Sequence, residues 1–131
     1  MAKLLYIDAC IRGENSRTRA LAEAYLDAYR AAHPQDGIET VDLSRTALKP
    51  LDCAALQARD AAFGAWNERQ FALARQLRGA DRIVIAAPFW NGTFPAALHV
   101  YFEHVCVAGL TFNCVDDRYE GLCRARECVF L

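Results

Sequence analysis

One apolar run constrains the fold of this chain more than any other feature. Residues 83–87 read Ile-Val-Ile-Ala-Ala, with no polar residue, and the run ends at Pro88. Because successive side chains of a strand point to opposite faces, a strand without polar alternation must be covered on both faces, as in a parallel sheet. Proline cannot donate to a sheet ladder, so the strand ends there. The run therefore predicts an α/β protein with a buried parallel strand at its centre.

The segment after this strand is unusual for a surface loop. Residues 89–94 read Phe-Trp-Asn-Gly-Thr-Phe, with three aromatics in six residues. Pro95 suits the first turn of a helix, which we expect to run to about Ala108 with a stripe of Leu98, Phe102, Val105 and Cys106. Ligands of open parallel sheets bind at the carboxyl ends of strands. The aromatic loop therefore indicates a flat, aromatic ligand.

The rest of the chain alternates between strand and helix patterns. Strands are expected at Lys3–Asp8, Ile38–Leu43, Ile83–Ala87 and Arg126–Leu131, and helices at Ser16–His33, Cys53–Gly79 and Pro95–Ala108. The second helix has a break near Phe63-Gly64, and Thr111–Leu122 is expected to be a polar excursion with a turn at Asp116-Asp117. This β-α-β-α-β-α-β order predicts a three-layer α/β/α domain with a parallel sheet of order 2-1-3-4.

Length and composition favour one globular domain over residues 1–131. Fifteen basic and sixteen acidic residues nearly cancel, so nucleic acid is not an expected partner. No apolar stretch is long enough for a signal peptide or a membrane span, and we expect a cytoplasmic protein that does not bind membranes. The six cysteines form no Cys-x-x-Cys pair, so free thiols are expected and a metal site is not.

In the order 2-1-3-4 the first and third strands are neighbours, so the loops after them line one crevice. The first loop leads into a helix N-terminus, where backbone N–H groups and the helix dipole favour an anion. Ser16 and Thr18 add hydroxyl donors, Arg17 and Arg19 add positive charge in the same turn, and Arg12 is close by. A phosphate site on one side and a flat ring on the other describe a nucleotide, and FMN above all.

Each of these features also has an ordinary structural explanation. Ser16 suits a helix N-cap, Arg17 and Arg19 suit a solvated surface, and Phe89 and Trp90 suit the core of a tight loop. Their occurrence together on two loops that the topology makes neighbours favours the ligand interpretation.

With these residues considered, the sequence resembles the FMN-dependent NADH-azoreductase and NAD(P)H:quinone oxidoreductase family, of flavodoxin-like fold. The resemblance is strongest at Ile85–Gly92 with Pro95, where the family has a motif that wraps the flavin ring. It implies that Pro88, Phe89, Trp90, Asn91 and Gly92 contact the isoalloxazine, largely through backbone groups.

The same resemblance implies that Cys10, Ser16, Arg17 and Thr18 lie at the FMN phosphate, and that Phe112 and Cys114 lie in the substrate pocket. Cys10 stands where the family commonly has serine, and Cys114 stands where a substrate-facing aromatic is common. The family continues beyond the fourth strand with a further flavin loop, a fifth strand and a last helix. We therefore expect a flavodoxin-like FMN-binding domain that is incomplete at its C-terminus, with the fifth strand missing.

The resemblance implies an enzyme in which NAD(P)H reduces FMN, which then reduces a quinone or azo compound by two electrons. It leaves the catalytic residues open, because the flavin carries the chemistry. It also implies a homodimer, and Val100, Tyr101 and Val107 make the helix after the aromatic loop apolar on more than one side. Two alternatives are a flavodoxin-type electron carrier and an inactive truncated apo fragment.

Overall fold

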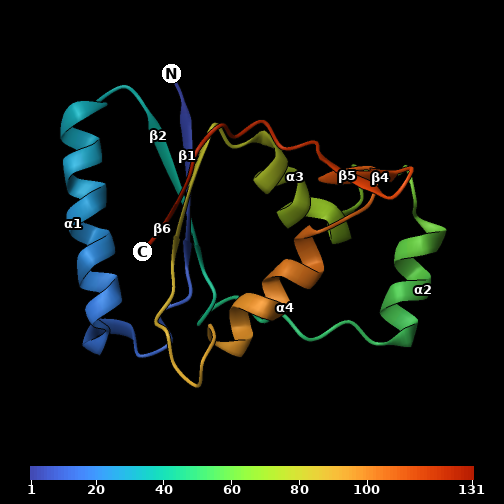
Figure 1. The fold of residues 1–131 in the computed structure, drawn as a ribbon, viewed down its shortest axis with the longest axis horizontal. Coiled ribbons are helices and arrows are strands. Elements are labelled where there is room, and N and C mark those ends of the chain that lie inside the picture. The colour runs from blue at the N-terminus through green and yellow to red at the C-terminus, as the bar shows by residue number, and fades with distance from the viewer.

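The computed structural model of the protein describes residues 1–131 and contains a four-stranded sheet between helices (Figure 1). Its strands are β1 (Lys3–Asp8), β2 (Gly37–Asp42), β3 (Arg82–Ala86) and β6 (Cys128–Phe130). They lie in the order β2-β1-β3-β6, and every pairing is parallel. This is the expected order, with β6 as the fourth strand.

Helices cover both faces of the sheet, which confirms the predicted three layers (Figure 1). α1 (Arg17–Ala32) packs on one face, and α3 (Ala72–Gly79) and α4 (Ala96–Val105) pack on the other. α2 (Cys53–Ala61) lies farther from the sheet, beyond α4 (Figure 1). Short 3₁₀ helices, η1 (Gly13–Asn15) and η2 (Arg69–Phe71), precede α1 and α3. None of the helices is both long enough and apolar enough to cross a membrane.

Residues of β1 and β3 point alternately into two apolar cores. Leu4 and Val84 face α1, whereas Ile7 and Ile85 join the core beneath α3 and α4. Leu4, Ile7 and Val84 are at most 1% exposed. Burial of each such side chain contributes roughly 1.5–3 kcal/mol. The uninterrupted apolar run is therefore explained by cover on both faces of β3.

The helical region predicted at Cys53–Gly79 is interrupted, as expected, near Gly64. α2 ends at Ala61, and Gly64 has φ +89°, a left-handed conformation that ends helical geometry. The interruption is longer than predicted, because regular α-helix returns only at Ala72. Aromatic packing of Trp66 on Phe71, with ring centroids 5.1 Å apart, holds the intervening segment against the core.

The polar excursion at Thr111–Leu122 contains an unpredicted hairpin of β4 (Phe112–Val115) and β5 (Arg118–Gly121), which pair in antiparallel fashion. The expected turn is present: Asp116 and Asp117 have φ of 51° and 59°, as a tight hairpin turn requires. All four residues of β5 are exposed, so the alternating pattern that marks a half-buried strand is missing.

Tyr101 and Val107 do not give α4 and the residues after it the second exposed apolar side that the sequence predicted. Tyr101 and Val107 are 0% and 3% exposed and belong to the core of this chain, so they do not form a second apolar face. The helix also ends at Val105, earlier than predicted, and Cys106 is exposed.

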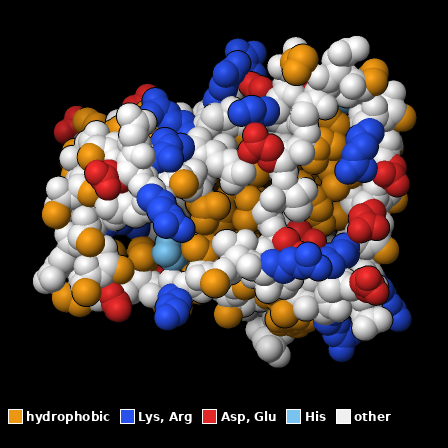
Figure 2. All heavy atoms as spheres, turned by 180° about the vertical axis from the view of Figure 1, so that it is seen from behind, with side chains coloured by type: hydrophobic (Ala, Val, Ile, Leu, Met, Phe, Trp, Pro, Cys, Tyr) orange, Lys and Arg blue, Asp and Glu red, His pale blue; other side chains and the backbone are white.

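On the face shown in Figure 2, acidic and basic side chains are interspersed, and neither sign forms a separate patch.

Candidate flavin site at the ends of β1 and β3

The carboxyl ends of β1 and β3 lie side by side. Asp8 pairs in register with Ala86, and the N–H of Ala9 donates a 2.8 Å hydrogen bond to the carbonyl of Ala86. The loop that follows β1 and the loop that follows β3 therefore start from hydrogen-bonded neighbours. Figure 1 shows both loops at the same end of the sheet, below β1 in that view. The predicted juxtaposition of the two loops is thus present.

The loop after β1 presents free backbone donors at the start of α1. Ser16 is buried and is the N-cap, since its Oγ accepts a 3.2 Å hydrogen bond from the N–H of Arg19. The N–H groups of Arg17 and Thr18 have no hydrogen-bond partner. Free N–H groups in the first turn of a helix can bind an anion, and the helix dipole favours negative charge there. The N-cap role predicted as an alternative for Ser16 is therefore real, and it leaves the neighbouring donors available.

The expectation that Arg19 adds charge for an anion is wrong. Its Nη2 lies 2.8 Å from Asp8 Oδ2 and 3.7 Å from Asp42 Oδ2, so two carboxylates of this chain already pair with it. Arg17, two residues earlier, is exposed at the helix terminus. Sequence reasoning missed Asp8, whose only signal is a carboxylate at the last position of a buried strand. The pairing joins residues of separate elements, which local sequence does not reveal.

Cys10 lies in the first loop, as predicted, but its side chain points inward. Cys10 is 1% exposed, and its Sγ lies 3.6 Å from the carbonyl oxygen of Ala86. Burial raises the pKa of the Cys10 thiol to about 11. The thiol is therefore protonated near neutral pH, which disfavours a redox role and supports the interpretation of Cys10 as a small loop residue.

The loop after β3 contains a tight turn. Trp90 and Thr93 exchange two backbone hydrogen bonds of 3.0 Å, and between them Asn91 and Gly92 have φ of 53° and 74°. Positive φ at both central residues is the requirement of a type I′ turn, for which Asn-Gly is the preferred pair. The N–H groups of Asn91 and Gly92 have no partner within the chain.

Phe89 is the exposed aromatic of this loop. Its N–H has no hydrogen-bond partner, and 76% of the residue is exposed, which contradicts the alternative that it belongs to the core. Trp90 and Pro88 are half-buried beside it. An exposed aromatic next to free N–H groups matches a flat ring with acceptor atoms at its edge.

These two loops fit the two ends of FMN. Free N–H groups at Arg17 and Thr18 suit a phosphate, and those at Asn91 and Gly92 suit the carbonyl and nitrogen acceptors of a flavin edge. Both sets occur at one end of the sheet, on loops joined through the Ala9–Ala86 hydrogen bond.

The predicted substrate-pocket residues lie elsewhere in the chain. Phe112 and Cys114 are on β4, and Figure 1 shows β4 and β5 at the opposite end of α4 from the loop that precedes that helix. Phe112 packs against Tyr119 with ring centroids 6.0 Å apart, and Cys114 is exposed. Within one chain, therefore, the structure does not bring these two residues to the candidate flavin loops.

Comparison with known families settles the class of the domain. A family model described as "Flavodoxin-like fold" matches residues 2–131, nearly the whole chain. The chain belongs to this flavodoxin-like family. The flavodoxin-like chain is 35% identical over 133 residues to the FMN-dependent NADH:quinone oxidoreductase 2 of Clostridium acetobutylicum, with 100% of this chain and 66% of that protein covered.

Solved structures give the same fold. The azoreductase from Bacillus anthracis str. Sterne has a TM-score of 0.86 and 27% identity, with 99% of this chain and 67% of that chain covered. The FMN-dependent NADH-azoreductase from B. anthracis str. Ames Ancestor, solved in complex with FMN, has a TM-score of 0.82 at 21% identity and covers 99% of this chain and 68% of its own. The flavodoxin-like chain described here spans 66% of the length of the two curated relatives from Clostridium acetobutylicum and Pseudomonas fluorescens that it matches.

Proposed function

We propose that this chain binds FMN across the ends of β1 and β3 and works as an FMN-dependent NAD(P)H oxidoreductase that reduces quinones or azo compounds. The observation that carries the proposal is the Ala9–Ala86 hydrogen bond, which joins the loop before a helix N-terminus with free N–H groups to the loop that contains the exposed Phe89. The names of the relatives, which are FMN-dependent NADH:quinone oxidoreductases and azoreductases, support the same chemistry.

The hydrogen-bond donors on each loop indicate which part of FMN that loop would bind. The N–H groups of Arg17 and Thr18, aided by the helix dipole, would bind the phosphate of FMN. The Asn91-Gly92 turn would hold its N–H groups at the edge of the isoalloxazine ring, while Phe89 and Trp90 would cover the ring and exclude water. Bound FMN would supply the two-electron hydride chemistry. No acid–base side chain of this chain is required, so orientation and shielding are the contributions of the protein.

We also propose that the active form is a homodimer, with Phe112 and Cys114 of one subunit completing the substrate pocket of the other. The position of β4 and β5, at the far end of α4 from the flavin loops, supports this arrangement (Figure 1). Sedimentation equilibrium at micromolar concentration tests it. A dimer is expected, and a clean monomer across that range would contradict the shared pocket.

Net charge favours the enzyme over an electron carrier of flavodoxin type. Such carriers are strongly acidic, whereas this chain has a formal net charge of −1.

A cytoplasmic location suits the proposed enzyme, because a reducing compartment keeps thiols such as the six free cysteines reduced.

Anaerobic reduction by NADH or NADPH distinguishes the proposed function from its alternatives. The protein is saturated with FMN, freed of excess cofactor and mixed with nicotinamide, and the flavin absorbance is followed. The proposal predicts rapid bleaching and recovery of colour when a quinone is added. Bound flavin that nicotinamide does not bleach would indicate a carrier, and failure to retain flavin would indicate an inactive fragment.

A further inference from the structure

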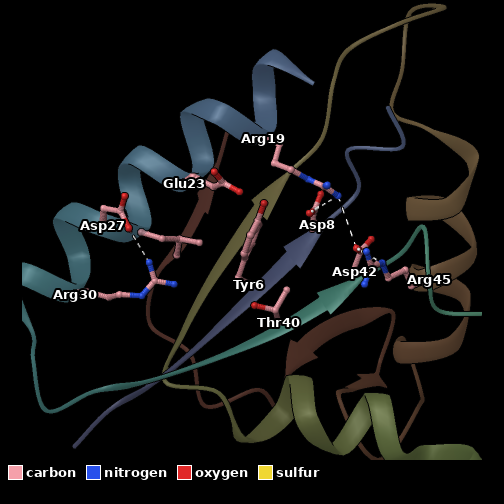
Figure 3. Close-up of a pocket in the computed structure, with 10 residues that line it drawn as sticks. Tyr6, Asp8, Arg19, Glu23, Asp27, Arg30, Thr40, Asp42 and Arg45 are labelled. Carbon is pink, nitrogen blue, oxygen red and sulfur yellow. Dashed lines mark hydrogen bonds and ion pairs between the residues drawn. The ribbon is translucent and has the colours of Figure 1, made fainter. Parts of the chain in front are cut away.

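An ion pair between the buried Asp8 and the partly buried Arg19 lies beneath the loop that follows β1 (Figure 3). Arg19 Nη2 lies 2.8 Å from Asp8 Oδ2, and the two side chains are 19% and 7% exposed. Asp8 Oδ1 accepts a 2.9 Å hydrogen bond from the N–H of Cys10, and Arg19 Nη2 also donates to the carbonyl of Cys10 at 3.4 Å. Both partners of the ion pair therefore bind the backbone of the same loop residue.

Arg19 also approaches the middle and the end of this loop. A Cβ placed on Gly13, which has φ +63°, would lie 3.7 Å from Arg19 Nη1. At the end of the loop, Ser16 Oγ accepts a hydrogen bond from the N–H of Arg19. Arg19 thus forms hydrogen bonds with Cys10 and Ser16, near the two ends of the connection between β1 and α1, and its side chain lies near Gly13 between them.

The charge of Arg19 is directed inward rather than toward a ligand at the helix terminus. Figure 3 shows its guanidinium extending from α1 to Asp8 and Asp42, at the ends of β1 and β2, beside a cavity of about 420 Å³. Apolar residues of similar volume often stabilise a fold as well as a buried ion pair does. The ion pair by itself is therefore weak evidence for a stabilising role, whereas its contacts with Cys10 point to a positional role.

We propose that Asp8 and Arg19 are positioning residues that hold the loop after β1 in its binding geometry before the ligand arrives. The inference rests on the proposed function, in which the N–H groups of Arg17 and Thr18 bind the phosphate of FMN. Ordering the loop in advance removes an entropic cost from binding, and that gain applies to the phosphate end of the ligand alone.

The substitution Asp8→Asn tests this role by the sign of its effect. It removes a negative charge close to the proposed phosphate site, so electrostatics alone would tighten FMN binding. The positioning role predicts the opposite: FMN binding to the apo protein weakens by about tenfold, equivalent to one charge-assisted hydrogen bond, and riboflavin binding does not change. Arg19→Lys, which keeps the charge but loses the guanidinium whose Nη2 contacts both Asp8 and Cys10, should weaken FMN binding in the same direction.

The matched control is Arg30→Met. Arg30 is on the same helix, lines the same cavity and pairs with Asp27 at 2.8 Å, but it forms no hydrogen bond or ion pair with the loop. This variant should bind both FMN and riboflavin as the wild type does.

Hydrogen exchange provides a readout without flavin. In the ligand-free protein, Asp8→Asn and Arg19→Lys should accelerate exchange of the Cys10, Gly13 and Ser16 amides, while amides in the centre of α1 stay protected. Unchanged loop exchange in both variants, or FMN binding that is equal or tighter, would overturn the positioning role. Equal wild-type affinity for FMN and riboflavin would instead overturn the proposed phosphate site, and the inference with it.

Discussion

The N–H of Ala9 donates a 2.8 Å hydrogen bond to the carbonyl of Ala86, which fixes the ends of β1 and β3 against each other. All that we propose about the site depends on this contact. It places a helix N-terminus with free N–H groups beside a turn with free N–H groups and an exposed phenylalanine. Neither loop alone accounts for both ends of a flavin nucleotide, whereas the two together do.

Replacing Arg17 and Thr18 with alanine should weaken FMN far more than riboflavin. The double substitution removes one charge and one hydroxyl at the proposed phosphate, each contributing roughly 1–3 kcal/mol, so a loss of tenfold or more is expected. Riboflavin lacks the phosphate and should bind nearly as before. Isothermal titration of the apo protein with both ligands measures the difference, and equal losses would remove this loop from the phosphate role.

A substitution in the Asn91-Gly92 turn should weaken the binding of the flavin ring rather than the binding of the phosphate. Gly92→Val places a β-branched residue at φ +74°, which strains the turn by about 1–3 kcal/mol. FMN and riboflavin should therefore lose affinity in parallel. Gly121→Val is the matched control, because Gly121 has no positive φ and a Cβ there meets nothing within 4 Å. A selective loss of FMN in Gly92→Val would contradict the assignment of this turn to the ring.

Replacement with phenylalanine should change the free energy of unfolding in opposite directions at Tyr101 and at Tyr29. Tyr101 is 0% exposed, and its hydroxyl has no hydrogen-bond partner, so Tyr101→Phe should raise the free energy of unfolding by about 1 kcal/mol. The hydroxyl of Tyr29 donates a 2.6 Å hydrogen bond to Asp36 Oδ2, so Tyr29→Phe should lower it. Urea unfolding at neutral pH measures both variants. A decrease for Tyr101→Phe would show that its hydroxyl has a stabilising partner.

The loss in Tyr29→Phe should depend on pH. The hydrogen bond from Tyr29, with one from the N–H of Ala2, lowers the pKa of Asp36 below its ordinary value. A carboxyl whose folded pKa is depressed stabilises the fold above its unfolded pKa of about 3.9, and this contribution is lost as the pH falls through the folded pKa. The stability gap between wild type and Tyr29→Phe should thus be widest near pH 7 and narrow below about pH 4. A gap that stays constant between these pH values would contradict the linkage.

Much of the fold follows from local sequence, because burial leaves a direct pattern. The run Ile83–Ala87 predicts a strand covered on both faces, and β3 occupies Arg82–Ala86. The hairpin of β4 and β5 could not be found in this way, since its side chains are largely exposed and only the Asp116-Asp117 turn marks it.

In the candidate site, too, local features could be predicted from the sequence and contacts between separate elements could not. Turn chemistry at Asn91-Gly92 and the N-cap at Ser16 are local and were predictable. The partner of Arg19 was not, because Asp8 reaches it only after β1 and α1 have packed together. The same limit explains the error at Tyr101 and Val107: apolarity shows that they are buried, but not whether the covering surface belongs to this chain or to another.

Amide chemical shifts during titration with FMN report directly on where the flavin binds. A flavin site at the ends of β1 and β3 predicts saturable shifts of the N–H signals of Arg17, Thr18, Phe89, Asn91 and Gly92 with FMN, and of only the last three with riboflavin. Amides that line the cavity beneath α1, such as that of Thr40, should not move. Absence of saturable shifts at both loops, or shifts confined to that cavity, would contradict a flavin site at the ends of β1 and β3.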